Sequence, residues 1–185
     1  MSGIIGYLIT ALLITLSIPI FGFIMEILIK ILYGLVAGVL GNKTAYLIFN
    51  RLSFIGVFHH ELSHALLSTL TGAKVKKIVF FKPEGDRLGY VEYSSRGNVF
   101  MRSIQNTMAS IAPVFCGAIS VVCLVHILST KDIAVWLYIF ILYSIISIIM
   151  HMTMSSQDFK VMWKGVPVVY IIILVVEIIF KFSFF

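Results

Sequence analysis

The stretch FHHELSHALL, residues 58–67, places three histidines and a glutamate within two helical turns of an otherwise apolar chain. His60, Glu61 and His64 form the pattern H-E-x-x-H within it. Four helical residues turn through about 400°, so His60 and His64 share one face, one turn apart. Two imidazole nitrogens with this spacing can bind one zinc ion at roughly 2 Å each. The pattern therefore predicts a helix that carries half of a zinc site.

Glu61 supplies the chemistry that such a site needs, because it lies beside the two histidines and can take a proton from a zinc-bound water. Zinc lowers the pKa of that water to about 7, so hydroxide becomes available near neutral pH. His59 points about 100° away from His60, which favours polar packing over ligation. A chance match is disfavoured, since an ionisable side chain inside a bilayer costs roughly 2.5–3.5 kcal/mol and zinc binding can offset that cost.

The rest of the chain has the composition of a membrane protein. Of its 185 residues, 60% are hydrophobic and 12% are charged, and its apolar runs approach the roughly 20 residues that cross a bilayer. The formal net charge is +6, and seven of the 14 Lys and Arg lie in residues 74–102. This clustering favours a cytoplasmic loop over a nucleic-acid surface. Cys116 and Cys123 lie within an apolar run, which predicts small buried hydrophobes.

The pattern of apolar runs predicts an all-α polytopic membrane protein with five to six transmembrane helices and a small β-hairpin on the cytoplasmic side. Residues 3–40 are too long for one straight crossing, so they form either two spans that turn near residues 19–22 or one span followed by an interfacial helix. Two β-rich runs, 75–81 and 88–94, flank the turn-like KPEGDR and predict the hairpin. Further apolar runs cover residues 45–70, 104–128, 133–154 and 166–180.

These runs are expected to form one domain, with N-terminal membrane segments (1–44), a catalytic core (45–165) and a C-terminal transmembrane helix (166–185). If residues 72–102 are cytoplasmic, alternate crossings bring the end of the histidine helix and the segment SSQDFKVMWKG to the same side of the membrane.

A catalytic zinc generally keeps three protein ligands and one open position. Asp158 is the best third candidate, because it is an anionic oxygen ligand on the expected side of the membrane. It lies nearer the membrane surface than His64, so a helix break near residues 155–156, or a tilted helix, has to bring the two together. His151 is the runner-up, seven residues earlier on roughly the same helical face.

From about residue 45 to 165 the chain resembles the site-2 protease family of intramembrane zinc metalloproteases. The resemblance is carried by HHELSHALL, by GYVEYS (89–94), by SIAPVFCG (110–117) and by SSQD (155–158). It implies that His60 and His64 are zinc ligands, that Glu61 is the catalytic base and that Asp158 is the third ligand. Many family members have Asp-Gly at the third ligand, whereas Ser155-x-x-Asp158 is similar to the variant of a smaller, compact branch.

The family hairpin offers a strand edge to an extended substrate, which makes Val91 and its neighbours candidate substrate contacts. Asn106 resembles a polar residue near the metal, where it could hold the scissile carbonyl or polarise an oxyanion; helix-end hydrogen bonding is the alternative.

The resemblance implies a zinc metalloendopeptidase with one catalytic Zn²⁺ and no other cofactor. Its partners would be the lipid bilayer and a transmembrane or membrane-associated peptide substrate, with no nucleic acid. The compact form is expected in a bacterial cell membrane, with the active site toward the cytoplasmic side. The alternatives are a catalytically inactive zinc-binding relative that acts as a binding partner or chaperone, and a transporter with metal-binding histidines.

Overall fold

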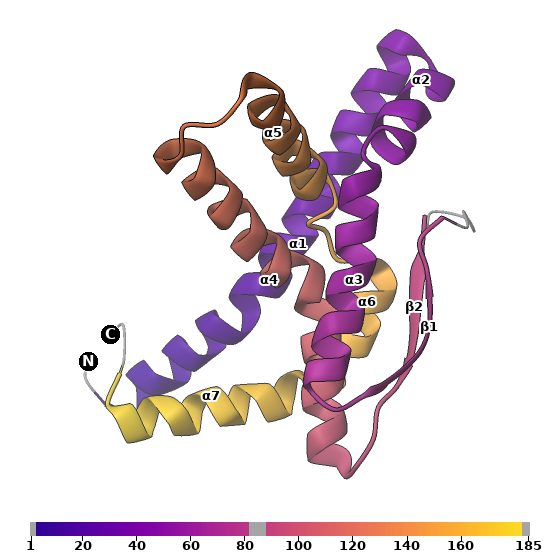
Figure 1. The fold of residues 1–185 in the computed structure, drawn as a ribbon. Helices are drawn as coiled ribbons and strands as arrows, with labels where there is room; N and C mark the ends of the chain where they lie inside the picture. Colours follow the sequence, from indigo (N-terminus) through magenta and orange to yellow (C-terminus); the bar gives the residue numbers. More distant parts are fainter. Residues whose placement is uncertain (1–2, 82–87, 183–185) are drawn as a thin grey trace.

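The computed structural model describes residues 3–81 and 88–182, and this part of the chain is helical except for one hairpin (Figure 1). The mostly helical fold and the hairpin confirm the predicted class. In chain order the elements are α1 (Ile4–Leu40), α2 (Asn42–Tyr46), a π-helical turn η1 (Leu47–Arg51), α3 (Phe54–Leu70), β1 (Lys74–Val79), β2 (Tyr90–Ser94), α4 (Val99–Thr130), α5 (Val135–Met150), α6 (Ser156–Met162) and α7 (Val166–Phe180).

The N-terminal region forms one uninterrupted helix, α1, which continues through Pro19. The alternative of two spans that turn near residues 19–22 is therefore wrong. Its buried face consists mainly of small residues, which let neighbouring backbones approach closely: Gly6, Thr10, Ala11, Thr15, Pro19 and Gly22. Helix α7 lies along the first half of α1, where Tyr170 donates a hydrogen bond to the Leu8 carbonyl at 3.3 Å, so the described ends of the chain are close together.

Among the described residues, two helices, α1 and α4, are long and apolar enough to cross a membrane. Helices α6 and α7 form a third candidate if this pair, bent by 60°, counts as one span. Helix α5 is apolar but shorter. The 17 residues of α3 include three histidines and a glutamate, which lower its hydropathy. The predicted number of five to six spans stays a prediction.

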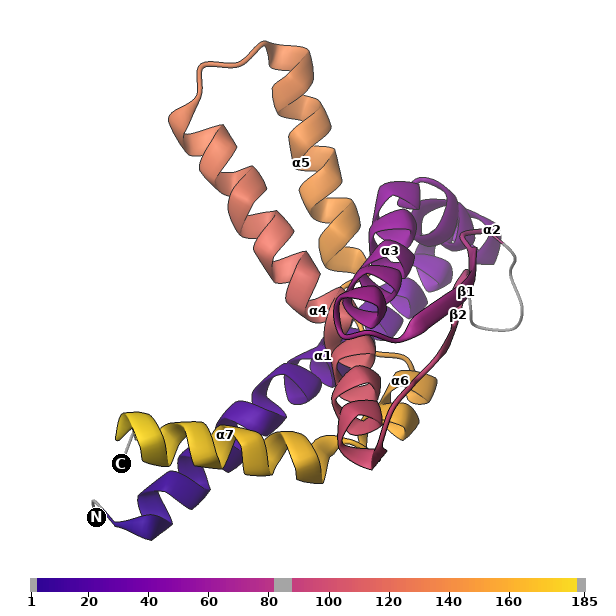
Figure 2. The same cartoon turned by 60° about the horizontal axis from the view of Figure 1, so that its bottom comes forward.

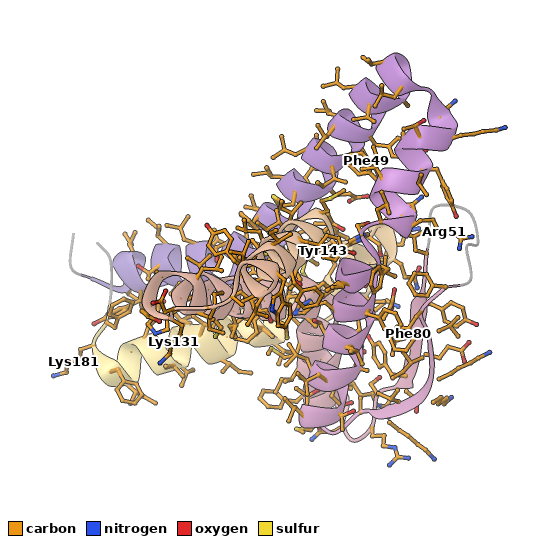
Figure 3. The ribbon with its side chains drawn as sticks, turned by 45° about the horizontal axis from the view of Figure 1, so that its top comes forward. Phe49, Arg51, Phe80, Lys131, Tyr143 and Lys181 are labelled. Atoms are coloured by element: carbon orange, nitrogen blue, oxygen red, sulfur yellow. The ribbon has the colours of Figure 1, made fainter. Side chains whose placement is uncertain are left out.

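The two strands pair antiparallel, as predicted, although both are shorter than the β-rich runs. The expected turn KPEGDR (82–87) lies outside the described residues. Phe58 of α3 packs between Phe80 and Phe81, with ring centroids 4.3 and 5.2 Å away, and Figure 3 shows Phe80 beside α3. The aromatic contacts hold the hairpin against the helix that carries the histidines.

Gln105 of α4 ties both ends of the hairpin to the helical core. Its side chain is 2% exposed. Its Oε1 accepts from the Arg96 backbone N–H at 2.7 Å, and its Nε2 donates to the Thr71 carbonyl at 3.1 Å. Thr71 precedes β1 and Arg96 follows β2, so one buried amide fixes where the hairpin begins and ends.

Helices α4 and α5 form an antiparallel pair that projects from the rest of the molecule (Figure 2). Only the C-terminal part of α5 meets α3, where the Gly56 N–H donates to Ser147 Oγ at 2.7 Å. A Cβ on Gly56 would collide with the Ser147 carbonyl. Figure 3 shows Lys131 and Lys181 toward one end of the molecule and Arg51 and Phe80 toward the other.

Candidate metal centre

The two histidines of the H-E-x-x-H pattern face each other across one turn of α3. Their Nε2 atoms are 3.1 Å apart, and His64 is 8% exposed. The helical spacing alone brings them together, as the sequence predicts.

Each ring is oriented by a hydrogen bond from its other nitrogen to a backbone carbonyl. His60 Nδ1 lies 2.8 Å from the His151 carbonyl oxygen, and His64 Nδ1 lies 2.7 Å from the Ala109 carbonyl oxygen. A carbonyl can only accept, so each Nδ1 carries the proton and each neutral ring keeps its lone pair on Nε2. Such hydrogen bonds are the usual support of metal-binding histidines.

Both carbonyls are available because helical hydrogen bonding is interrupted beside them. Proline has no backbone N–H, so Pro113, four residues after Ala109, leaves the Ala109 carbonyl without its helical donor. Helix α5 ends at Met150, so the His151 carbonyl lies in the extended stretch that follows. Two breaks in regular helix thus orient the two imidazoles.

Asp158 approaches from the start of α6. Its Oδ1 lies 3.8 Å from His64 Nε2, while its Oδ2 accepts from the Ser155 backbone N–H at 2.9 Å and from Ser155 Oγ at 2.6 Å. Ser155 caps α6 and forms a capping box with Asp158. The non-helical residues between α5 and α6 provide the break needed to bring Asp158 to the level of His64.

The three side chains fit a metal ion. One ligand atom from each of His60, His64 and Asp158 lies within 4.8 Å of the other two, and no second group of this kind occurs in residues 3–81 and 88–182. Two Nε2 lone pairs 3.1 Å apart repel each other unless a cation lies between them. Two imidazoles and one carboxylate are a ligand set typical of catalytic zinc.

Glu61 lies beside this group and is 5% exposed. A Cβ built on Gly89, just before β2, would lie 2.9 Å from Glu61 Oε1 and 2.5 Å from the Val79 carbonyl oxygen. Only a glycine lets the hairpin backbone approach the carboxylate this closely. Sequence reasoning included Gly89 in GYVEYS but missed this contact, which depends on how the hairpin lies on α3.

A cavity of about 960 Å³ opens over the site, between α3, the hairpin and α6. Its wall includes His60, Glu61, His64 and Asp158, together with the predicted substrate contacts Val91 and Asn106.

Tyr93 also lines this cavity, and sequence reasoning did not single it out. Burial of the phenol, with a smaller contribution from the nearby charge of Asp158, raises the pKa of Tyr93 to about 12. Its hydroxyl therefore stays protonated at any physiological pH and can act as a hydrogen-bond donor.

The remaining candidates lie at the edge of the metal group. The ring of His151 is turned toward Ser53, with its Nε2 2.9 Å from Ser53 Oγ, and its backbone carbonyl contacts the candidate ligand His60. His59 Nε2 lies 2.9 Å from Ser120 Oγ of α4, which is the polar packing expected from its helical angle. The structure thus groups Asp158, and not His151, with the two imidazoles.

This arrangement of candidate ligands and buried glutamate, in a chain with helices long and apolar enough to span a membrane, is typical of membrane metalloproteases. Residues 28–156 match the family model described as Peptidase M50B-like, so the chain belongs to this family and the resemblance to site-2 proteases is confirmed. The match covers both histidines and ends two residues before Asp158. No curated protein and no solved structure gives a significant match to the chain.

Replacing Pro113 with Ala should weaken zinc binding by about 10- to 100-fold, the usual cost of losing a hydrogen-bond partner of a ligand. The new backbone N–H would compete with His64 Nδ1 for the Ala109 carbonyl. Zinc affinity would be measured by competition with a chelator in detergent. Pro19→Ala, which restores an N–H to α1, is the matched control; an equal loss of affinity in both variants would show a general effect on helices.

Proposed function

We propose that this protein is a zinc-dependent intramembrane endopeptidase that hydrolyses peptide bonds of membrane-embedded or membrane-associated substrates. The observation that supports it most directly is the approach of His60 Nε2, His64 Nε2 and Asp158 Oδ1 to one another beside the buried carboxyl group of Glu61. The family match supports the same reaction class.

In this proposal His60, His64 and Asp158 hold the zinc ion. Zinc, when bound, would polarise the scissile carbonyl and lower the pKa of the attacking water. Glu61 removes the proton from that water at a carboxylate oxygen and later delivers it to the leaving amine nitrogen. The hydroxyl of the water stays on the carbonyl carbon, and the C–N bond breaks. The Nδ1 hydrogen bonds keep both imidazole rings in orientation throughout.

The substrate lies along β2 in an extended conformation. A helical substrate hides its carbonyls from attack, whereas a strand edge pairs with an unwound backbone of almost any sequence. Val91 of β2 lines the cavity and is the proposed contact for the substrate. Asn106 and the protonated hydroxyl of Tyr93 are the proposed donors to the scissile carbonyl.

Three features of the wider protein belong to the proposal. The Ser155-x-x-Asp158 pair, here a capping box, takes the place of the Asp-Gly pair of many family members. The hairpin and the site lie on the cytoplasmic side of a bacterial cell membrane, as the basic residues between β1 and α4 favour. Lys131 and Lys181, toward the opposite end of the molecule in Figure 3, would then face outward.

The proposal is tested by reconstituting the protein in liposomes with a fluorogenic transmembrane peptide. Cleavage should require zinc, stop when a chelator is added and return when zinc is restored. Retained zinc without cleavage of any tested peptide would favour an inactive relative that acts as a binding partner. Zinc movement into the liposomes without peptide cleavage would favour a transporter.

A further inference from the structure

Strand β1 contains an irregularity that gives Lys76 no partner on β2. The register passes from Val75 opposite Tyr93 to Lys77 opposite Glu92. Bulges of this kind occur next to active sites, where they redirect a side chain. The exposed side chain of Lys76 lines the catalytic cavity, whereas Lys77 does not.

A second lysine reaches the same cavity from α6 and the turn that follows it. Asp158, Val161 and Lys164 line the wall at intervals of three residues, which is one face of a helix. The Lys164 N–H donates to the Val161 carbonyl, so the helical path continues past the end of α6. At helical rise, Lys164 lies about 9 Å along the axis from the candidate ligand Asp158.

Lys76 and Lys164 are exposed and form no ion pair with any part of the chain that the structure describes. Lys77, in contrast, stands over the Tyr90 ring, 5.9 Å from its centroid, and faces Glu92 in the register. Among the residues that the structure describes, these two cationic groups of the cavity have no ion-pair partner.

We propose that Lys76 and Lys164 bind acidic side chains of the substrate and so select peptides with a carboxylate close to the scissile bond. The inference rests on the proposed endopeptidase function. An extended peptide advances about 3.3 Å per residue, so Lys164 reaches a side chain about three residues from the reacting carbonyl. Lys76 acts from the hairpin, on the strand next to the one that pairs with the substrate.

The test measures peptide binding to a zinc-loaded Glu61→Gln protein, which retains the cavity and does not cleave. Three labelled peptides share one apolar core and carry a pair of Glu, Gln or Lys residues at its cytoplasmic flank. In nanodiscs of phosphatidylcholine, the Glu peptide should bind more tightly than the Gln peptide by about two- to fivefold for each lysine, as for exposed ion pairs. The double variant Lys76→Glu and Lys164→Glu should prefer the Lys peptide.

The matched control is Lys77→Glu with Lys160→Glu. These exposed lysines lie on β1 and α6, close in sequence to Lys76 and Lys164, and do not line the cavity, and their substitution gives the same net charge. The control should keep the wild-type order of peptides. Equal binding of the three peptides, or an equal change of preference in the control, would overturn the inference. A binding preference without any peptidase activity of the wild type would refute the proposed function and support only the binding of acidic peptides by the two lysines, without selection for cleavage.

Discussion

Replacing Glu61 with Gln should abolish peptide cleavage while the protein still binds one zinc ion. Loss of a general acid–base group lowers the rate by about 10²- to 10⁴-fold, and Glu61 serves both proton transfers in the proposed reaction. Glutamine has nearly the same shape, so it fits the buried space beside Gly89. Glu61 is not one of the three grouped ligands, so the zinc content should not change. Cleavage of the fluorogenic peptide and zinc per protein are measured on the same preparation.

Glu92→Gln is the matched control, since Glu92 lines the same cavity from β2 and is exposed. It should retain most of the activity. A Glu61→Gln protein with normal cleavage would exclude Glu61 as the base. A Glu61→Gln protein that had lost both cleavage and its zinc would mean that Glu61 belongs to the ligand set.

Asp158→Ala should lose zinc, or bind it more than about 100-fold more weakly. It removes a ligand itself, and losing only a partner of a ligand already costs about 10- to 100-fold. The paired side-chain variant is His151→Ala, which leaves the His151 carbonyl in place for His60 Nδ1. That variant should retain zinc. Zinc content of the detergent-purified proteins is measured beside the wild type, which should hold one ion.

Asp132→Ala provides the charge control, because Asp132 is an exposed aspartate between α4 and α5. Zinc retained in Asp158→Ala and lost in His151→Ala would move the third ligand to His151. A well-folded wild type that binds no zinc after zinc is added back would remove the basis of the peptidase proposal.

The sequence predicted the parts of the site that depend on local geometry. Helical periodicity alone places His60 and His64 on one face, and alternating β-rich runs around a turn-like segment predict the hairpin. Asp158 was identified as the best third candidate from its chemistry and expected side of the membrane. Its contact with Ser155 through a capping box is local as well, and it follows from the spacing of the two residues.

Features that depend on tertiary packing could not be predicted. The Ala109 carbonyl meets His64 only because α4 packs against α3, 45 residues away in sequence. Gly89 meets Glu61 because the hairpin packs on α3, where Phe58 contacts Phe80. The continuity of α1 was missed because a proline and a glycine commonly mark turns, whereas here both lie on its buried face.

Because of its length, the orientation of α1 should depend on the thickness of the bilayer, and α1 contacts the segment beside the candidate metal centre. Its 37 residues extend about 55 Å, nearly twice the roughly 30 Å of hydrocarbon in a typical bilayer. Even at a tilt of about 40° from the bilayer normal, the largest tilt in the observed range, a substantial part of the helix projects beyond the hydrocarbon. A thicker bilayer would therefore immerse more of α1 or make it more upright. Gly22 of this helix accepts a backbone hydrogen bond from Met154, between the His151 carbonyl and Ser155. A change in the tilt of α1 would therefore act on the segment whose His151 carbonyl and Ser155 contact His60 and Asp158.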